Sequence, residues 1–223
     1  MSTMSLEFRA RAHAALGDPS RLAIVDLLAH GDLASGELAA RLDLPTNLAA
    51  HHLHVLEQAG LIVRRRSEGD GRRTYVRRTP SCNQILGATT RVSRPRTIAF
   101  VCSHNSARSQ LAEHYWRTVS EIPVLSAGTH PARRVHPGAI AVARRHGLDL
   151  TGAAPKLADD VLTGDEFMIA VCDRAHEDLH TQSLHWSIPD PARSDDPRAF
   201  EAAYRDITSR VDLLAASVEA EPS

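Results

Sequence analysis

The segment IAFVCSHNSARSQLAEHYW, residues 98–116, places a cysteine at the end of an apolar run and an arginine six residues after it. Residues 97–101 have the continuous apolar character of a buried parallel strand, and the residues from Ser109 onward have the apolar spacing of a helix. A loop that joins a strand directly to a helix turns successive backbone N–H groups toward one point, where the helix dipole adds positive potential. The segment therefore predicts a loop that binds a tetrahedral oxyanion. The helix positions expected to face the core are Leu111, Tyr115 and Val119.

Two side chains of this loop, Cys102 and Arg108, carry the predicted chemistry. Amide dipoles and a guanidinium both stabilise a thiolate, so we interpret Cys102 as the nucleophile. The planar guanidinium of Arg108 matches two oxygens of the bound anion, which a lysine does not. We expect Ser109 to donate a hydrogen bond to the sulfur and the side-chain amide of Asn105 to tie the loop together. The full set of predicted oxyanion-binding residues is Ser103, His104, Asn105, Ser106, Ala107, Arg108 and Ser109.

The composition is that of a globular protein that binds no membrane. The chain has 223 residues, enough for two domains, with 43% hydrophobic and 24% charged residues. No apolar run approaches the roughly eighteen residues of a membrane helix, and the first residues include an early acid and no apolar block, so we expect a cytoplasmic protein. The three cysteines, Cys82, Cys102 and Cys172, are too few and too scattered for a disulfide framework.

The net charge of −1 hides an asymmetry between the two parts of the chain. Residues 1–94 contain thirteen arginines and nine acidic residues and carry +4, whereas the remainder carries −5. A basic N-terminal part is a mild indication of a nucleic-acid partner, although charge alone favours solvated surface residues as its explanation.

The N-terminal part shows four helical patterns followed by two strand-like segments. A short third helix, a break at DLP and a fourth helix are typical of a helix-turn-helix, and the hairpin around EGDG is typical of a wing. In the fourth helix we expect Leu48, Ala49, Leu53 and Leu56 to face inward. The residues predicted to face the DNA major groove are Thr46, Asn47, Ala50, His51 and His54. The wing arginines predicted to lie along phosphates are Arg64, Arg66, Arg72 and Arg73.

The motifs ALGDPSRL and HHLHVLEQAGL, together with the wing, resemble the ArsR-type winged-helix repressors over about residues 6–80. This resemblance implies a homodimer that binds two-fold operator DNA. The segment HGDLASGEL lacks the cysteine pair of the family's arsenic sensors, and we expect no metal site. We interpret His51, His52 and His54 as surface and groove-facing residues, and Cys82 as a buried small side chain. The alternative is a helical bundle with a basic hairpin.

A change from helical to strand-like periodicity follows RVSRPR, where Pro95 cannot continue a helix. We therefore predict a winged-helix DNA-binding domain over residues 1–90, a linker over residues 91–96 and a second domain over residues 97–223. The expected fold class is α/β overall, with an α+β winged helix-turn-helix followed by a four-stranded parallel sheet.

The second domain resembles the low-molecular-weight protein tyrosine phosphatases, and more closely their arsenate reductase branch, over about residues 97–217. The motifs that carry this resemblance are VCSHNSARSQLAE, SAGTHP, AVCDRAHEDL and HWSIPDPA. The resemblance implies that Asp190, followed by proline, protonates the leaving oxygen. Gln110 replaces the proline of many phosphatases, and DPARSDD lacks the tyrosines of a phosphotyrosine slot, so both features favour a reductase.

A reductase of this kind needs a second thiol after Cys102 has formed an adduct with arsenic. Thioredoxin-coupled relatives carry further cysteines where this chain has Ala107 and Leu179. We therefore expect no bound cofactor and an external thiol reductant, mycothiol-like or thioredoxin-like. As a hypothesis, Cys172 attacks the adduct and pairs with Cys102; the alternative is a merely buried cysteine.

These observations predict a bifunctional arsenic-resistance protein that joins a DNA-binding transcriptional repressor to a thiol-dependent arsenate reductase. Its expected partners are operator DNA, arsenate or phosphate, a thiol donor and a second copy of the chain. One alternative is a regulator whose C-terminal domain senses the oxyanion without turnover. Another is a protein tyrosine phosphatase fused to a DNA-binding domain.

Overall fold

The computed structural model describes residues 4–87, 91–179, 181, 183–194 and 196–218. The chain forms two compact units and passes from the first to the second between Arg91 and Val92. The predicted domain end at residue 90 falls on positions 88–90, which lie outside the described residues. Val92, inside the predicted linker, donates its N–H to the carbonyl of Ser217 at 3.0 Å and so lies within the second unit.

The first unit combines helices with a small antiparallel sheet, as predicted for a winged helix-turn-helix. Its sheet has the strand order β1-β3-β2. Asp18 caps the second helix by accepting a hydrogen bond from the N–H of Arg21 at 3.0 Å. The elements are α1 (Leu6–Leu16), α2 (Pro19–Leu27), β1 (Leu33–Ala34), α3 (Ser35–Arg41), α4 (Thr46–Gln58), β2 (Ile62–Arg66), β3 (Thr74–Arg78) and α5 (Pro80–Leu86).

The core of the first unit contains the apolar face of α4, including Leu53 and Leu56, packed on residues of α2 and α3. Cys82 is fully buried in this core, as expected for a small apolar side chain. Two expectations for α4 are wrong. Leu48 is 39% exposed, because it lies two positions after the helix start and off the packed face, and His52 is buried among core residues.

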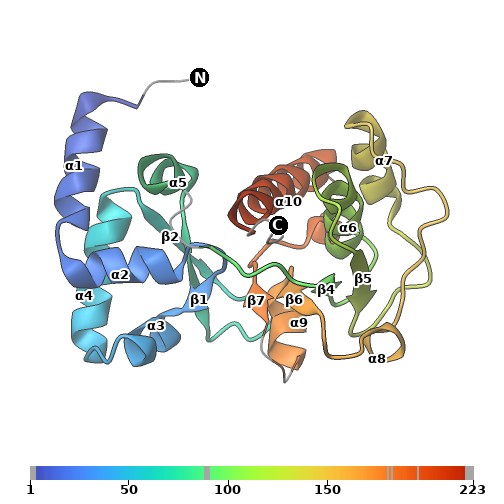
Figure 1. The fold of residues 1–223 in the computed structure, drawn as a ribbon, viewed down its shortest axis with the longest axis horizontal. Coiled ribbons are helices and arrows are strands. Elements are labelled where there is room, and N and C mark those ends of the chain that lie inside the picture. The colour runs from blue at the N-terminus through green and yellow to red at the C-terminus, as the bar shows by residue number, and fades with distance from the viewer. Residues whose placement is uncertain (1–3, 88–90, 180, 182, 195, 219–223) are drawn as a thin grey trace. The chain divides into compact units, whose positions relative to one another are not determined.

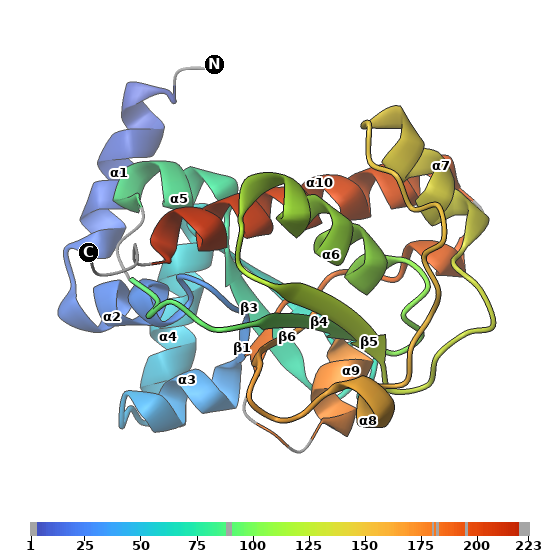
Figure 2. The same cartoon turned by 45° about the vertical axis from the view of Figure 1, so that its right-hand side comes forward.

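The second unit is a four-stranded parallel sheet with the order β5-β4-β6-β7, as predicted. Helices α6 and α10 cover one face of this sheet, and α9 lies on the other (Figures 1 and 2). The elements are β4 (Ile98–Cys102), α6 (Arg108–Val119), β5 (Val124–Gly128), α7 (Pro137–Arg145), α8 (Ala158–Val161), β6 (Phe167–Ala170), α9 (Asp173–Asp178), β7 (Leu184–His185), a short 3-10 helix (Pro191–Arg193) and α10 (Pro197–Ser217).

Aromatic side chains pack at the centre of the second unit. The ring of Phe100, on the central strand β4, lies 6.2 Å from the ring of Trp116 and 5.7 Å from that of Trp186. The indole N–H of Trp116 donates to the carbonyl of Ile122 at 3.1 Å, so this buried polar group has a partner. Val119 was expected to face the core but is 40% exposed, because the last turn of α6 extends beyond the packed face.

The carboxyl ends of β4 and β6 bring two cysteines to the same edge of the sheet. Val101 pairs with Ala170, and the N–H of Val171 donates to the carbonyl of Val101 at 2.7 Å. Cys102 and Cys172 therefore leave neighbouring strands at nearly the same level. In open α/β sheets this edge is where ligands bind.

Candidate active site

The loop of residues 102–107, hereafter the anion loop, is held in place by hydrogen bonds to its carbonyl groups. Backbone N–H groups of the segment that follows β5 donate to four of them, at 2.7 to 3.2 Å. In a trans peptide the N–H of the next residue points away from the carbonyl, so the amides that follow these carbonyls turn toward the inside of the loop. The donor and acceptor pairs are Thr129 to Cys102, His130 to Ser103, Ala132 to His104 and His136 to Ser106.

The sulfur of Cys102 lies among hydrogen-bond donors at the centre of this loop. The backbone N–H of Asn105 donates to Sγ at 3.2 Å, and the hydroxyl of Ser109 lies 3.0 Å from it. The Cys102 side chain is buried, so these two contacts are made away from solvent. The loop therefore surrounds the sulfur of Cys102 with inward-facing amides.

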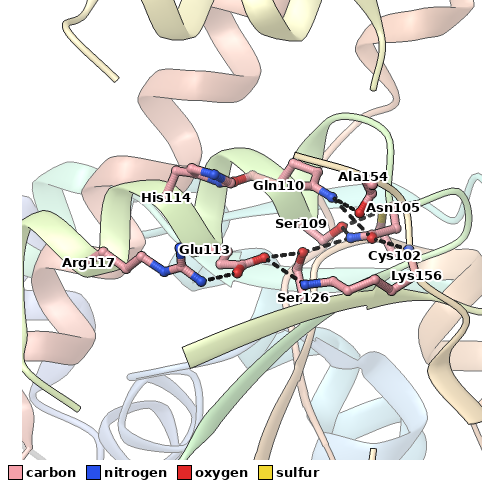
Figure 3. A network of polar contacts seen from close by, with 10 residues as sticks. All are labelled: Cys102, Asn105, Ser109, Gln110, Glu113, His114, Arg117, Ser126, Ala154 and Lys156. Atoms are coloured by element: carbon pink, nitrogen blue, oxygen red, sulfur yellow. Dashed lines mark hydrogen bonds and ion pairs between the residues drawn. The ribbon is translucent and has the colours of Figure 1, made fainter. Parts of the chain in front are cut away.

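Asn105 holds the loop in shape and has a backbone φ of 45°, a region that asparagine tolerates better than most residues. Its amide nitrogen donates to the hydroxyls of Ser109 and Ser126, both at 2.8 Å. Its carbonyl oxygen accepts from the side chain of Gln110 at 3.1 Å and from the N–H of Lys156 at 2.8 Å. All four contacts of this fully buried amide are made within the network of Figure 3.

The same network continues to Glu113, an acidic side chain that is only 3% exposed. Its carboxylate accepts from the hydroxyl of Ser126 and forms ion pairs with Arg117 and with Lys156, whose Nζ lies at 3.5 Å. A buried carboxylate needs such partners. Glu113 thus connects α6 to Ser126 and Lys156, and both of these residues hydrogen-bond to Asn105.

Arg108 occupies the start of α6 and closes the loop. Its guanidinium is buried, donates to the carbonyl of Ile188 at 2.8 Å and lies 3.4 Å from the carboxylate of Asp190. Burial alone would lower the pKa of Arg108, but the nearby Cys172, Cys102 and Asp190 raise it above its usual value. The guanidinium is therefore a permanent positive charge beside the sulfur.

A cavity of about 230 Å³ lies in front of these groups, and its lining includes Ser103, His104, Arg108, Cys172 and Asp190. It is large enough for a tetrahedral oxyanion. The structure thus brings Asp190 and Cys172, predicted from separate segments, to the anion loop. His104 is exposed at this cavity, whereas Ser103 and Ala107 are buried in the loop and Ser106 is partly buried.

Cys172 is buried, and its sulfur lies 3.6 Å from the hydroxyl of Ser103. The sulfur also accepts a hydrogen bond from the N–H of Ala175 at 3.4 Å, at the start of α9. Burial raises the pKa of the Cys172 thiol, and the positive charge of Arg108 offsets only part of that effect. Burial therefore disfavours the thiolate form of Cys172.

Seven residues of the network in Figure 3 had no assigned site role from the sequence: Gln110, Glu113, His114, Arg117, Ser126, Ala154 and Lys156. Ser126 lies within the strand β5 and Lys156 lies in a loop, so neither has a local pattern that marks it. Glu113 did carry a signal, because it follows Ser109 by four residues and so shares a helix face with it.

In the first unit, the turn between α3 and α4 contains Asp43 at a φ of 50°. All five α4 residues predicted to contact bases are exposed. Leu48 of the same helix is also exposed. His52, by contrast, is buried and lies 3.8 Å from the carboxylate of Asp18. The five exposed residues are Thr46, Asn47, Ala50, His51 and His54.

The wing arginines fall into two groups. Arg64 forms an ion pair with Glu57, whose pKa that hydrogen bond lowers, and Arg66 donates to the carbonyl of Gly71. Arg72 and Arg73 are exposed in the loop between β2 and β3. Arg64 and Arg66 therefore also have partners within the hairpin and helix of their own unit.

Two features are absent from the residues that the structure describes. No group of three histidine, cysteine, aspartate or glutamate side chains there could hold a metal ion. None of the described helices combines the length and apolar character needed to cross a lipid bilayer.

Known proteins resemble both units. A model of the family described as "Low molecular weight phosphotyrosine protein phosphatase" matches residues 97–223, and one described as "Helix-turn-helix domain" matches residues 16–65. Arsenate reductase 1 of Bacillus cereus is 30% identical over 132 residues, 56% of this chain and 97% of that protein. The arsenate reductase of Bacillus licheniformis is 32% identical over 108 residues, 45% of this chain and 77% of that protein.

Among solved structures, the tyrosine phosphatase amsI of Erwinia amylovora matches with a TM-score of 0.50 and 19% identity. The match covers 56% of this chain and 95% of that one. At this identity the likeness shows the fold alone.

A substitution at Gly128 tests whether the position of the anion loop backbone matters for anion binding. A Cβ at this position would lie 2.9 Å from the carbonyl oxygen of Ser103 and 3.0 Å from the backbone nitrogen of Asn105. We expect Gly128→Ala to displace the loop and to weaken phosphate binding by roughly tenfold, a cost within the range of about 1–3 kcal/mol for overpacking. Calorimetric titration with phosphate measures this. Gly36→Ala, at a site with no atom within 4 Å, is the control, and unchanged binding in Gly128→Ala would contradict the expectation.

Proposed function

The chain belongs to the low molecular weight phosphotyrosine protein phosphatase family through residues 97–223, and we propose that this part reduces arsenate to arsenite. The observation that carries the proposal is the anion loop, in which the Cys102 sulfur lies among inward-facing amides and next to the buried Arg108. Arsenate has the shape and charge of phosphate, so the same loop binds either. The relatives named arsenate reductase support the choice of arsenate.

The first step is attack by the Cys102 sulfur on arsenic. A bond forms between sulfur and arsenic, and one arsenate oxygen leaves as water. Asp190 supplies the proton to that oxygen, since its carboxyl group lies beside Arg108 at the cavity. Arg108 and the loop amides hold the remaining oxygens, where negative charge concentrates.

The second step transfers two electrons to arsenic. A thiolate attacks the sulfur of Cys102, a disulfide bond forms, and the bond between sulfur and arsenic breaks with its electron pair left on arsenic, which becomes arsenite. A second thiol then reduces the mixed disulfide and restores Cys102. We assign both thiols to an external donor, because burial disfavours the thiolate form of Cys172 and a thiol attacks far more slowly than a thiolate.

The first unit binds operator DNA and represses transcription in this proposal. The match to the helix-turn-helix family and the exposed residues of α4 support it. A second copy of the chain would place a second α4 on the other half of a two-fold operator. The exposed Leu48 adds an apolar group suited to a thymine methyl.

A phosphatase activity is the second candidate, since the matching family is described as a phosphotyrosine protein phosphatase and the Asp190 carboxylate lies 3.4 Å from Arg108 at the cavity. Hydrolysis of p-nitrophenyl phosphate in the absence of thiol separates the two activities. A sensor without turnover would bind the oxyanion and consume neither substrate.

Cys102→Ser and Arg108→Lys separate binding from chemistry. We expect Cys102→Ser to lose arsenate reduction entirely and to bind phosphate within about threefold of the wild type, because amides and guanidinium hold the anion. Arg108→Lys should weaken phosphate binding by roughly tenfold, about 1.4 kcal/mol, since a lysine cannot form the bidentate contact. Coupled thiol-oxidation assays and calorimetry measure the two effects, with Arg198→Lys, an exposed position, as the control. If Cys102→Ser lost phosphate binding while Arg108→Lys kept it, the roles assigned to these two residues would have to be exchanged.

Cys172→Ala tests the source of the electrons. With an external thiol as the direct attacker, we expect this variant to retain turnover with glutathione within about twofold. Circular dichroism checks that it folds, and Cys82→Ala is the matched control for a buried cysteine. Loss of turnover in a folded Cys172→Ala, together with a Cys102–Cys172 disulfide in the wild type by mass spectrometry, would instead make Cys172 the attacking thiol.

His51→Ala and Arg73→Ala test DNA binding. We expect His51→Ala, on the exposed face of α4, to weaken specific operator binding by about 1–3 kcal/mol and non-specific binding little. Arg73→Ala, in the wing, should weaken both and reduce the salt slope by about one. Gel-shift titrations at several salt concentrations measure both, with Gln58→Ala at the exposed end of α4 as control. An equal loss of specific and non-specific binding in His51→Ala would contradict the base contact.

A further inference from the structure

A second cavity, of about 610 Å³, adjoins the anion loop within the second unit. Its volume falls in the range of small-molecule sites, roughly 300–1,000 Å³. None of the catalytic roles assigned above uses it. The lining residues that matter here are Ser106, Ala132, Arg134, His136, Arg145 and Phe200.

This cavity shares a wall with the anion loop. The N–H of Ala132 donates to the carbonyl of His104 at 2.9 Å, and the N–H of His136 donates to that of Ser106 at 2.8 Å. The N–H of Asn105 lies 3.2 Å from the Cys102 sulfur, and Ser106 is the next residue. The lining of the cavity therefore begins only one residue after this contact with the sulfur.

An aromatic pair forms the apolar part of the lining. The ring of His136 stacks on that of Phe200, with the ring centres 4.9 Å apart and a tilt of 22°. Gly138 permits this, because a Cβ there would lie 2.5 Å from the Phe200 ring. Nδ1 of His136 accepts from the N–H of Gly138 at 3.1 Å, which leaves Nε2 as the hydrogen-bond donor of a neutral ring.

Two arginines make the cavity basic in a part of the chain that is otherwise acidic. Arg134 is exposed and has no charged partner among the described residues. Arg145 lies 3.3 Å from the carboxylate of Glu201, yet half of its side chain is exposed and its other N–H groups remain available. Arg133 is exposed as well, but it is not part of the lining.

We propose that this cavity binds the body of the electron donor, and that the donor is a low-molecular-weight thiol that carries carboxylates. Arg134 and Arg145 would pair with the carboxylates, while the apolar stem lies against the rings of His136 and Phe200. The donor sulfur then reaches the Cys102 sulfur past Ser106 and forms the disulfide as the bond to arsenic breaks. The proposal rests on the proposed arsenate reduction, which supplies the arsenic that accepts the electron pair.

Steady-state kinetics with two thiols test the assignment. Glutathione carries two carboxylates, and 2-mercaptoethanol carries none. We expect Arg134→Ala to raise the KM for glutathione by roughly five- to tenfold, and the Arg134→Ala/Arg145→Ala double variant to raise it further, as charge-assisted hydrogen bonds are lost. The KM for 2-mercaptoethanol, the KM for arsenate and kcat should stay within about twofold. Arg133→Ala is the matched control and should leave all values unchanged.

Two kinetic results would overturn the proposal. One is an equal rise in KM for 2-mercaptoethanol, which would show that the arginine does not act on carboxylates. The other is an equal effect of Arg133→Ala, which would reduce the finding to general surface charge. A KM for p-nitrophenyl phosphate that depends on Arg134 while that for glutathione does not would assign the cavity to the leaving group of an organic phosphate instead.

A binding experiment distinguishes failure of this inference from failure of the proposed function. S-methylglutathione has the same carboxylates but no thiol, so its binding by NMR titration needs no turnover. Binding that shifts the resonances of Ser106 and His136 and is lost in Arg134→Ala supports the cavity even if the wild type reduces no arsenate with any thiol. An absence of such shifts overturns the inference even if arsenate is reduced.

Discussion

The chemistry of this chain depends on how the carbonyl groups of residues 102–106 are held. Four of them accept hydrogen bonds from the segment after β5, and each bond turns the following N–H inward. Without these bonds the same peptides could rotate and present oxygen, which repels an anion. The requirement extends to β5 itself, because Gly128 is packed against the loop backbone too closely for any side chain.

The positive φ of Asn105 shows the cost of this arrangement and how it is offset. An asparagine in the left-handed region is strained, and such strain persists only where surroundings fix it. Here the side chain makes four hydrogen bonds, and Ser126, which accepts one, also donates to the buried carboxylate of Glu113. Lys156 supplies both a backbone N–H to Asn105 and a positive charge near Glu113. The loop that contains Lys156 therefore contacts the network at both of these residues.

Much of the fold follows from local pattern, and so does the centre of the site. The apolar run of β4, the helix that begins at Arg108 and the residues between them are contiguous, so periodicity and turn chemistry identify them. The two-residue strand β1 and the seven-residue helix α5 show no clear period and were not predicted. Leu48 and Val119 were misplaced because an apolar residue near a helix end can face solvent when no neighbour covers that turn. Ser126 and Lys156 reach the site only through tertiary packing, which no local pattern records.

The anion loop has an amide side and a carbonyl side. In the proposed reaction the oxyanion binds at the amide side and the thiol donor at the carbonyl side. Its amide side faces the oxyanion, while its carbonyl side is bound to residues 129–136, which also form a wall of the basic cavity. Both the arsenic and the donor must meet the same atom, the sulfur of Cys102, in turn. A donor that entered through the oxyanion cavity would have to wait for arsenite to leave, yet arsenite leaves only when the donor attacks. In the proposed reaction, two adjoining cavities on one loop remove that conflict.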